Sequence, residues 1–255
     1  MPDKRVPLLR REVKPIWRIL EYTVIPLMWL LVDIRREGSG NLPRDGAFVV
    51  APNHTSNIDP IVMGIGVFRS GRTPHFLGKA SLFRVPVVKG LLRITGQIPV
   101  ERAGASRDNP LTTAALVAER GSGVIVYPEG TLTRDPGLWP MRGKTGAVRL
   151  ALSAGVPLIP CAHWGTERFL APYAKFPRLI PRQHITIRFG APVDLSEFEG
   201  RALDAVTINA ATDKLMAAIT GLVEQLRGET APVERWDPAQ HGQTEFGHPN
   251  ESASS

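Results

Sequence analysis

Short apolar segments rich in β-branched residues alternate along this chain with longer segments of helical periodicity. A strand buried on both faces is a short apolar run, whereas a helix packed on a sheet repeats its apolar residues about every three to four positions. Strands separated by helices predict an α/β fold, a mixed, largely parallel sheet flanked by helices. The expected strands are residues 47–52, 75–77, 97–100, 124–127, 158–163 and 185–189, and the expected helices are 61–68, 81–94, 111–120, 145–154 and 205–227.

The length of 255 residues suits one such domain with an appendage at each end. Residues 1–38 are expected to form a basic, amphipathic helical segment that associates with membranes, and residues 39–228 the α/β domain. Residues 229–255 are polar and rich in Gly, Pro, Glu and Ser, which is typical of a flexible tail. The hydrophobic share of 43% is enough for a sizeable core.

The amino-terminal segment combines an apolar run, residues 16–32, with basic residues and two tryptophans. A bilayer-spanning helix needs about 20 predominantly apolar residues, and this run is shorter and interrupted by Arg18, Glu21 and Pro26. We therefore expect an interfacial helix on an anionic membrane surface rather than a span or a signal peptide. The alternative is a helix packed on the domain's own core. The apolar residues at helical spacing are Ile16, Leu20, Val24, Leu27 and Leu31, and the basic residues are Lys4, Arg5, Arg10, Arg11, Lys14 and Arg18.

The net charge of +7 favours an anionic partner, which could be a phosphate group, a nucleic acid or an acidic membrane surface. Nucleic acid is not expected, because the chain has no nucleic-acid-binding motif and its basic residues are dispersed beyond the amino terminus. Cys161 is the only cysteine, which excludes an intrachain disulfide, and its apolar neighbours predict a buried thiol. The six histidines show no metal-ligand spacing, so no metal site is expected.

A histidine, His54, follows the first predicted strand of the domain, and an aspartate, Asp59, comes five residues later. Five residues of an ideal helix turn through roughly 500°, so the two side chains can meet only if His54 lies in a turn and a helix begins after it. The imidazole could then act as a general base whose tautomer the carboxylate fixes. Because the chain lacks a Gly-x-Ser-x-Gly elbow, the base would activate a hydroxyl of the substrate. The alternative is that Asp59 only begins a helix and His54 is an ordinary loop residue.

Three further clusters lie at or beside predicted strands. Residues 127–135 place Glu129 and the turn-forming Gly130 after a strand, although an ordinary turn has the same pattern. Arg102 ends another cluster and could bind a phosphate through a forked pair or form a surface salt bridge. Residues 155–160 are an apolar strand bracketed by prolines, for which a place in the core is the alternative.

The order of the four clusters is more specific than any one of them: Asn-His-x-x-x-x-Asp, Gly-x-Ile-x-Val-x-Arg, Tyr-Pro-Glu-Gly-Thr and Val-Pro-Leu-Ile-Pro. Together they resemble the lysophospholipid acyltransferase family, in particular the bacterial 1-acyl-glycerol-3-phosphate acyltransferases. The resemblance runs from about Gly40 to Phe189 and includes residues 76–80 and 144–147. It implies a glycerolphosphate acyltransferase-like fold and the transfer of a fatty acyl group from a thioester to lysophosphatidic acid, giving phosphatidic acid.

The resemblance also implies roles for individual residues. His54 would be the catalytic base and Asp59 its partner. Pro157 and Pro160 would shape the site or the acyl-donor region. The residues implied in acceptor binding are Lys79, Arg102, Glu129, Gly130 and Thr131.

One position departs from the family pattern. The family usually has an arginine directly after Gly-Thr, but here that place is taken by Leu132, so Arg134 would have to reach the same phosphate. The leucine leaves glycerol 3-phosphate or a glycolipid hydroxyl open as the acceptor. Two readings outside acyl transfer to an alcohol are a thioesterase, with water at the same base, and a non-enzymatic basic protein.

The expected partners follow from the same resemblance. The acyl donor would be acyl-CoA or acyl carrier protein, and no cofactor is expected. The protein would act at the cytoplasmic face of the cell membrane as a peripheral or monotopic protein.

Overall fold

The computed structural model describes residues 15–79, 90, 94–100, 116–119, 121 and 123–243. Within these residues, a seven-stranded sheet has the order β1-β7-β6-β2-β5-β3-β4. The strands are β1 (Val32–Glu37), β2 (Phe48–Pro52), β3 (Pro74–Lys79), β4 (Ile98–Val100), β5 (Gly123–Ile125), β6 (Leu158–Trp164) and β7 (Gln183–Phe189).

The sheet is mixed and largely parallel, which confirms the predicted fold class. Strands β4, β3, β5, β2 and β6 are joined by parallel pairings, whereas β7 is antiparallel to β6 and parallel to β1. The carboxyl ends of five strands therefore meet at one edge of the sheet, where α/β proteins place their binding sites.

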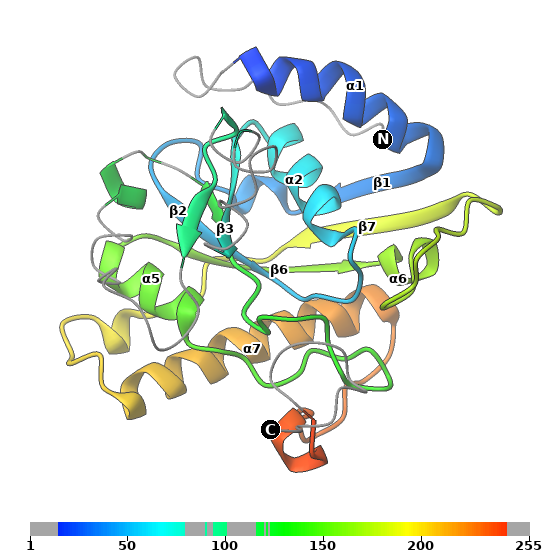
Figure 1. The fold of residues 1–255 in the computed structure, drawn as a ribbon. Helices are drawn as coiled ribbons and strands as arrows, with labels where there is room; N and C mark the ends of the chain where they lie inside the picture. Colours follow the sequence, from blue (N-terminus) through cyan, green and yellow to red (C-terminus); the bar gives the residue numbers. More distant parts are fainter. Residues whose placement is uncertain are drawn as a thin grey trace.

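Helices cover both faces of the sheet, with α1 and α2 on one face and α5 and α7 on the other (Figure 1). Successive strand residues point to opposite faces, so Val49 packs in the cluster that includes α5 and α7, while Val50 packs in the cluster that includes α2. The helices are α1 (Pro15–Leu31), α2 (Asp59–Arg69), α5 (Gly146–Ala154), α6 (Thr166–Phe169) and α7 (Ala205–Arg227), with short 3-10 turns at Ser39–Asn41, Ser196–Phe198 and Pro238–His241.

Strand β1 lies within the segment that we expected to be helical and membrane-associated. Its residues alternate between buried and more exposed, and they pair in register with β7 from Val32↔Gln183 to Glu37↔Arg188. The sheet therefore begins at Val32. The expected helices 81–94 and 111–120 lie mostly outside the described residues.

The first part of the expected carboxyl-terminal tail packs on the domain. The backbone N–H of Ala231 donates to the Glu224 carboxylate at 2.8 Å, and the N–H of Arg142 donates to the Trp236 carbonyl at 2.9 Å. Residues 229–243 thus return across the end of α7 and differ from the flexible tail that we expected, whereas residues 244–255 lie outside the described part of the chain.

Helix α1 is apolar on both of its faces. Val24 and Leu31, from the predicted stripe, pack against the α2-side core, so this part of the stripe faces the protein. The outer face is also apolar, because Ile19, Tyr22 and Leu30 are 57%, 69% and 77% exposed. Among the described residues, no helix is both long and apolar enough to cross a bilayer.

Candidate active site

His54 and Asp59 meet as the spacing predicts. His54 lies in the turn after β2, and α2 begins at Asp59, so Nδ1 of His54 comes within 2.9 Å of Oδ2 of Asp59. An ionised carboxylate only accepts hydrogen bonds, so Nδ1 of His54 carries the proton and donates it to Asp59. The other ring nitrogen, Nε2, is thereby left as the basic one, on a side chain that is 16% exposed.

Asp59 is buried and is held as a carboxylate. Oδ2 accepts the backbone N–H groups of Thr55 and Ser56, each at 2.7 Å. Burial raises the pKa of Asp59, but the nearby His163 and the hydrogen bond from His54 outweigh it, so the pKa lies below its usual value. The side chain that fixes the tautomer of His54 is therefore charged at neutral pH.

A second histidine, His163, lies behind this pair and was not predicted from the sequence. Its Nε2 is 2.8 Å from the Asn53 carbonyl oxygen and 3.5 Å from Oδ2 of Asp59, and the side chain is fully buried. Asn53 and His163 also exchange hydrogen bonds, because the Asn53 side chain donates to the His163 carbonyl and accepts from its N–H. His163 on β6 therefore ties the turn after β2 to the neighbouring strand.

Glu129 holds the main chain of His54. Oε1 of Glu129 accepts the N–H of His54 at 2.9 Å, and Oε2 accepts the N–H of Met141 at 3.1 Å. The Thr133 N–H donates to the His54 carbonyl at 2.7 Å. The turn that follows β5 thus clamps both main-chain polar groups of His54. Because the Glu129 carboxyl is only 1% exposed, burial raises its pKa to about 8, in spite of the two N–H groups that it accepts.

The imidazole of His54 is also held by an aromatic neighbour. The ring of Tyr127, which lies just after β5, stacks on it with centroids 4.1 Å apart and planes at 28°. This contact limits rotation of the imidazole out of the plane that Asp59 selects.

The prolines of the fourth cluster anchor the strand that leads to His54. The Pro157 carbonyl accepts the N–H of Val49 at 2.9 Å, and Pro160 lies opposite Ala51 in the pairing of β6 with β2. Pro157 therefore holds the start of β2, whereas Pro160 lies within β6 near the end of β2 that leads to His54.

The other predicted residues lie at varied positions. Gly130 has a φ of +74°, which glycine adopts readily, and a side chain there would press on Lys144. Thr131 follows in the same turn. Lys79 is the last residue of β3, and Arg102 lies outside the described residues.

Leu132 occupies the position where the family pattern has an arginine, and Arg134 is the next arginine along the chain. Leu132 is 4% exposed, and the Arg134 side chain is also buried, at 6% exposed. The position where the family pattern has an arginine therefore carries an apolar, buried group here.

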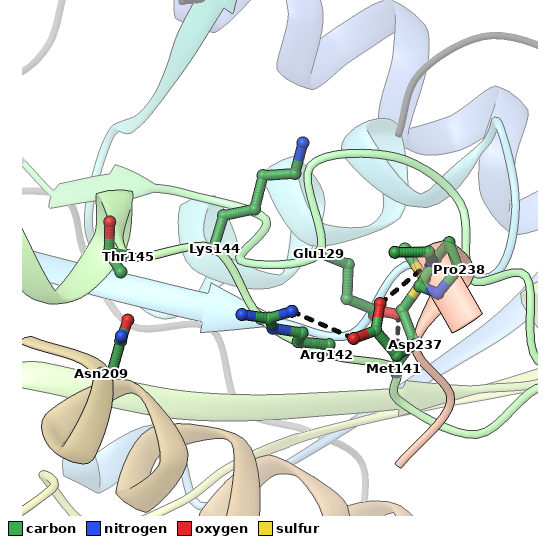
Figure 2. Close-up of a pocket in the computed structure, with 10 residues that line it drawn as sticks. Glu129, Met141, Arg142, Lys144, Thr145, Asn209, Asp237 and Pro238 are labelled. Atoms are coloured by element: carbon green, nitrogen blue, oxygen red, sulfur yellow. Dashed lines mark hydrogen bonds and ion pairs between the residues drawn. The ribbon is translucent and has the colours of Figure 1, made fainter. Parts of the chain in front are cut away.

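A polar pocket of about 290 Å³ adjoins Glu129. Figure 2 shows that residues 141–145, Asn209 of α7 and the start of the Pro238–His241 turn line it, and that Arg142 pairs with Asp237. The Arg142–Asp237 ion pair measures 3.0 Å. The described lining of the pocket does not include His54, but it includes Glu129, which accepts the main-chain N–H of His54. The lining residues are Glu129, Met141, Arg142, Gly143, Lys144, Thr145, Asn209, Asp237, Pro238 and Ala239.

The described residues contain no group of three or more His, Cys, Asp or Glu side chains that could hold a metal ion. What they assemble is an imidazole oriented by a buried carboxylate at the carboxyl ends of β2, β5 and β6. Such a pair can remove a proton from a hydroxyl group.

Comparisons with known proteins give independent information. A family model described as Acyltransferase matches residues 33–164, more than half of the chain. The 1-acyl-sn-glycerol-3-phosphate acyltransferase of Bacillus subtilis is 32% identical over 125 residues, which cover 49% of this chain and 59% of that protein. The enzyme of the same name from Escherichia coli is 31% identical over 138 residues, which cover 53% of each chain. The matches thus span about half the length of these curated relatives.

A solved structure shows the same fold. The crystal structure of the 1-acyl-sn-glycerophosphate (LPA) acyltransferase from Thermotoga maritima superimposes with a TM-score of 0.60. The match covers 85% of this chain and 81% of that one, at 24% sequence identity. This likeness supports the fold class predicted from the alternating strands and helices.

Proposed function

The chain belongs to the Acyltransferase family, and from this premise we propose that it moves a fatty acyl group from a thioester to the hydroxyl of lysophosphatidic acid, giving phosphatidic acid. The observation that carries the proposal is the 2.9 Å contact between Nδ1 of His54 and the buried carboxylate of Asp59. The names of the curated relatives support lysophosphatidic acid as the acceptor.

The reaction needs one base and good alignment. Nε2 of His54 takes the proton of the acceptor hydroxyl as its oxygen attacks the thioester carbonyl, and Asp59 stabilises the imidazolium that forms. The tetrahedral intermediate then expels the thiolate, which takes the proton back from His54. General base catalysis typically contributes ~10²–10⁴-fold, and alignment of the two substrates can supply several kcal/mol more.

The donor in this proposal is acyl-CoA or acyl carrier protein, because both carry the fatty acid as an activated thioester. A thioester already has a good leaving group, so the reaction calls for no cofactor. The same base could pass a proton from water, so a thioesterase is the alternative reaction at this site.

We place the protein on the cytoplasmic face of the cell membrane as a peripheral or monotopic protein. The apolar outer face of α1 supports this placement, since large exposed apolar surfaces mark interaction sites. The net charge of +7 favours anionic lipids. A lipid acceptor would then reach His54 without leaving the bilayer surface.

A second acceptor is favoured by Leu132. A buried leucine in the position of the family's arginine cannot itself bind a phosphate, so that contact would have to come from Arg134 or be absent. Glycerol 3-phosphate or a glycolipid hydroxyl therefore remains an alternative acceptor for the same chemistry.

The test is the release of free thiol from palmitoyl-CoA by the wild-type protein and by His54→Ala. Each is assayed without acceptor and with lysophosphatidic acid, glycerol 3-phosphate or a glycolipid. Release that requires both His54 and lysophosphatidic acid supports the proposal, whereas release that needs no acceptor would indicate a thioesterase. Release that requires His54 but a different acceptor would support the alternative.

A further inference from the structure

The segment between α6 and β7 exposes an apolar and basic surface. Residues 175–182 are all exposed, and Phe176, Leu179 and Ile180 are 83%, 50% and 91% exposed. The same eight residues include three basic side chains and no acidic one. Bulky apolar side chains exposed so close together are typical of a surface that binds a partner.

The whole loop between α6 and β7, which runs from Leu170 to Arg182, is anchored at both ends. At its start, the Leu170 carbonyl accepts the hydroxyl of Ser56 at 2.6 Å, and Ser56 lies in the turn that carries His54. At its end, the guanidinium of Arg182 donates to the carbonyls of Trp29 and Val32, where α1 gives way to β1. In Figure 1, α6, the start of β7 and the carboxyl-terminal end of α1 all lie at the right-hand end of the molecule. The loop therefore connects the turn that carries His54 to the end of α1.

We propose that residues 175–182 form a second membrane-docking element, which enters an anionic bilayer together with the outer face of α1. Phe176 and Ile180 would enter the boundary between headgroups and acyl chains, and Lys175 and Arg178 would contact anionic headgroups. The inference rests on the proposed function, because a lipid acceptor must enter the site from a membrane.

Charge and continuity select a bilayer as the partner. Interfacial segments combine bulky apolar side chains with lysine and arginine, whose long stems let the charged head stay at the headgroup level. The bond from Arg182 to the end of α1 makes the segment continuous with a helix whose outer face is also apolar. Docking here brings the membrane to the loop whose first residue, Leu170, accepts the hydroxyl of Ser56 from the turn that carries His54.

The test uses a single engineered cysteine, because the native Cys161 is fully buried. Ile180→Cys is labelled with an environment-sensitive fluorophore and mixed with vesicles of phosphatidylcholine, with or without phosphatidylglycerol. We expect a blue shift that requires phosphatidylglycerol. The matched control is Val233→Cys, at a fully exposed residue beyond α7, and its label should not shift.

A second pair of variants measures the contribution to binding. The double variant Phe176→Ser, Ile180→Ser should bind vesicles roughly tenfold or more weakly, because it lacks the two apolar side chains whose burial in the bilayer would favour binding. Val206→Ser with Val233→Ser also removes two exposed apolar groups and should leave partition unchanged. Thermal unfolding of the two cysteine variants and the two double serine variants checks that each is folded.

An unshifted label at position 180, or equal partition of both double variants, would overturn the proposal, as would wild-type protein that binds neither kind of vesicle. Neither readout uses turnover. Thiol release with lysophosphatidic acid is measured separately, so membrane docking without acyl transfer would reject the proposed function and leave this inference standing.

Discussion

The Glu129 carboxyl group accepts the backbone N–H of His54 at 2.9 Å, although the two residues are 75 positions apart in the sequence. They meet because β2 and β5 are parallel neighbours, so the turns that follow them lie at the same edge of the sheet. The position of the base thus depends on a contact between two of the four sequence clusters.

Replacing Glu129 by alanine should lower both stability and activity. The change leaves the buried N–H groups of His54 and Met141 without their acceptor, at about 1–3 kcal/mol for each unsatisfied group. We expect the free energy of unfolding to fall by roughly 2–6 kcal/mol, measured by denaturant titration. The control is Glu199→Ala, at an exposed position. If Glu129→Ala lowered the free energy of unfolding no more than this control, the two hydrogen bonds of Glu129 would not be needed for stability.

The same carboxyl should make stability depend on pH. Burial raises the pKa of Glu129 to about 8, whereas an unfolded glutamate titrates near about 4.3. Between these values the folded protein holds a proton that the unfolded chain has released, so stability falls as pH rises through this window and levels off above it.

The measurement is the unfolding midpoint between about pH 5 and pH 9, across that titration. Glu129→Gln does not titrate and should flatten the fall, although Glu167, whose pKa burial also raises, will leave a smaller slope. A slope in Glu129→Gln equal to that of the wild type would contradict this assignment.

Replacing Asp59 by asparagine should remove the charge that stabilises the His54 imidazolium and disturb the tautomer. We expect turnover to fall by roughly 10²–10⁴-fold, as in other sites where a carboxylate orients a histidine. Stability should fall as well, because the carboxylate also accepts the N–H groups of Thr55 and Ser56. Steady-state thiol release, measured with protein shown to be folded, decides the point; activity within tenfold of the wild type would exclude the role.

His163 should act as a positioning residue. In His163→Gln the buried contacts with Asn53 and Asp59 are weakened. We expect kcat to fall by up to roughly 10²-fold, as a misplacement of about 1 Å can cause, with little change in KM. The control is His184→Gln, because His184 also lies 2.9 Å from an aspartate, Asp33, but with an exposed side chain. Equal effects of the two changes would mean that the buried position of His163 has no special role.

Cys161 should be unreactive in the folded protein. The side chain is fully buried on β6, and burial raises the pKa of its thiol well above the usual value, which suppresses the reactive thiolate. N-ethylmaleimide should therefore modify it only after denaturation, as seen by mass spectrometry. Rapid labelling of the native protein would show that this part of the core opens.

Local patterns predicted most strands and the contact between His54 and Asp59, because the signals for them lie within a few residues. The run before His54 is buried on both faces of the sheet, and α2 begins at Asp59, so spacing alone constrained their geometry. Strand β1 was missed because Val32 directly continues the apolar run of α1 and four of the six strand residues are charged, which is unlike a buried strand. Only its pairing with β7, about 150 residues away, makes it a strand.

Contacts between distant segments were beyond the sequence. His163 carries no local signal of its role, because its partner Asp59 is on another strand's turn and the two meet only when β6 pairs with β2. The position of Glu129 after a strand and the family resemblance both marked it as a site residue, but neither predicted its hydrogen bond to the main chain of His54. Periodicity found the apolar stripe of α1, but could not show that part of it faces the core while the other face is apolar too.

The most direct test of the account is thiol release from palmitoyl-CoA in the presence of lysophosphatidic acid, comparing wild-type protein with His54→Ala. We expect the variant to keep its fold and to lose roughly 10²–10⁴-fold in turnover, the usual contribution of a general base. Turnover near the wild-type level in a folded His54→Ala protein would contradict it.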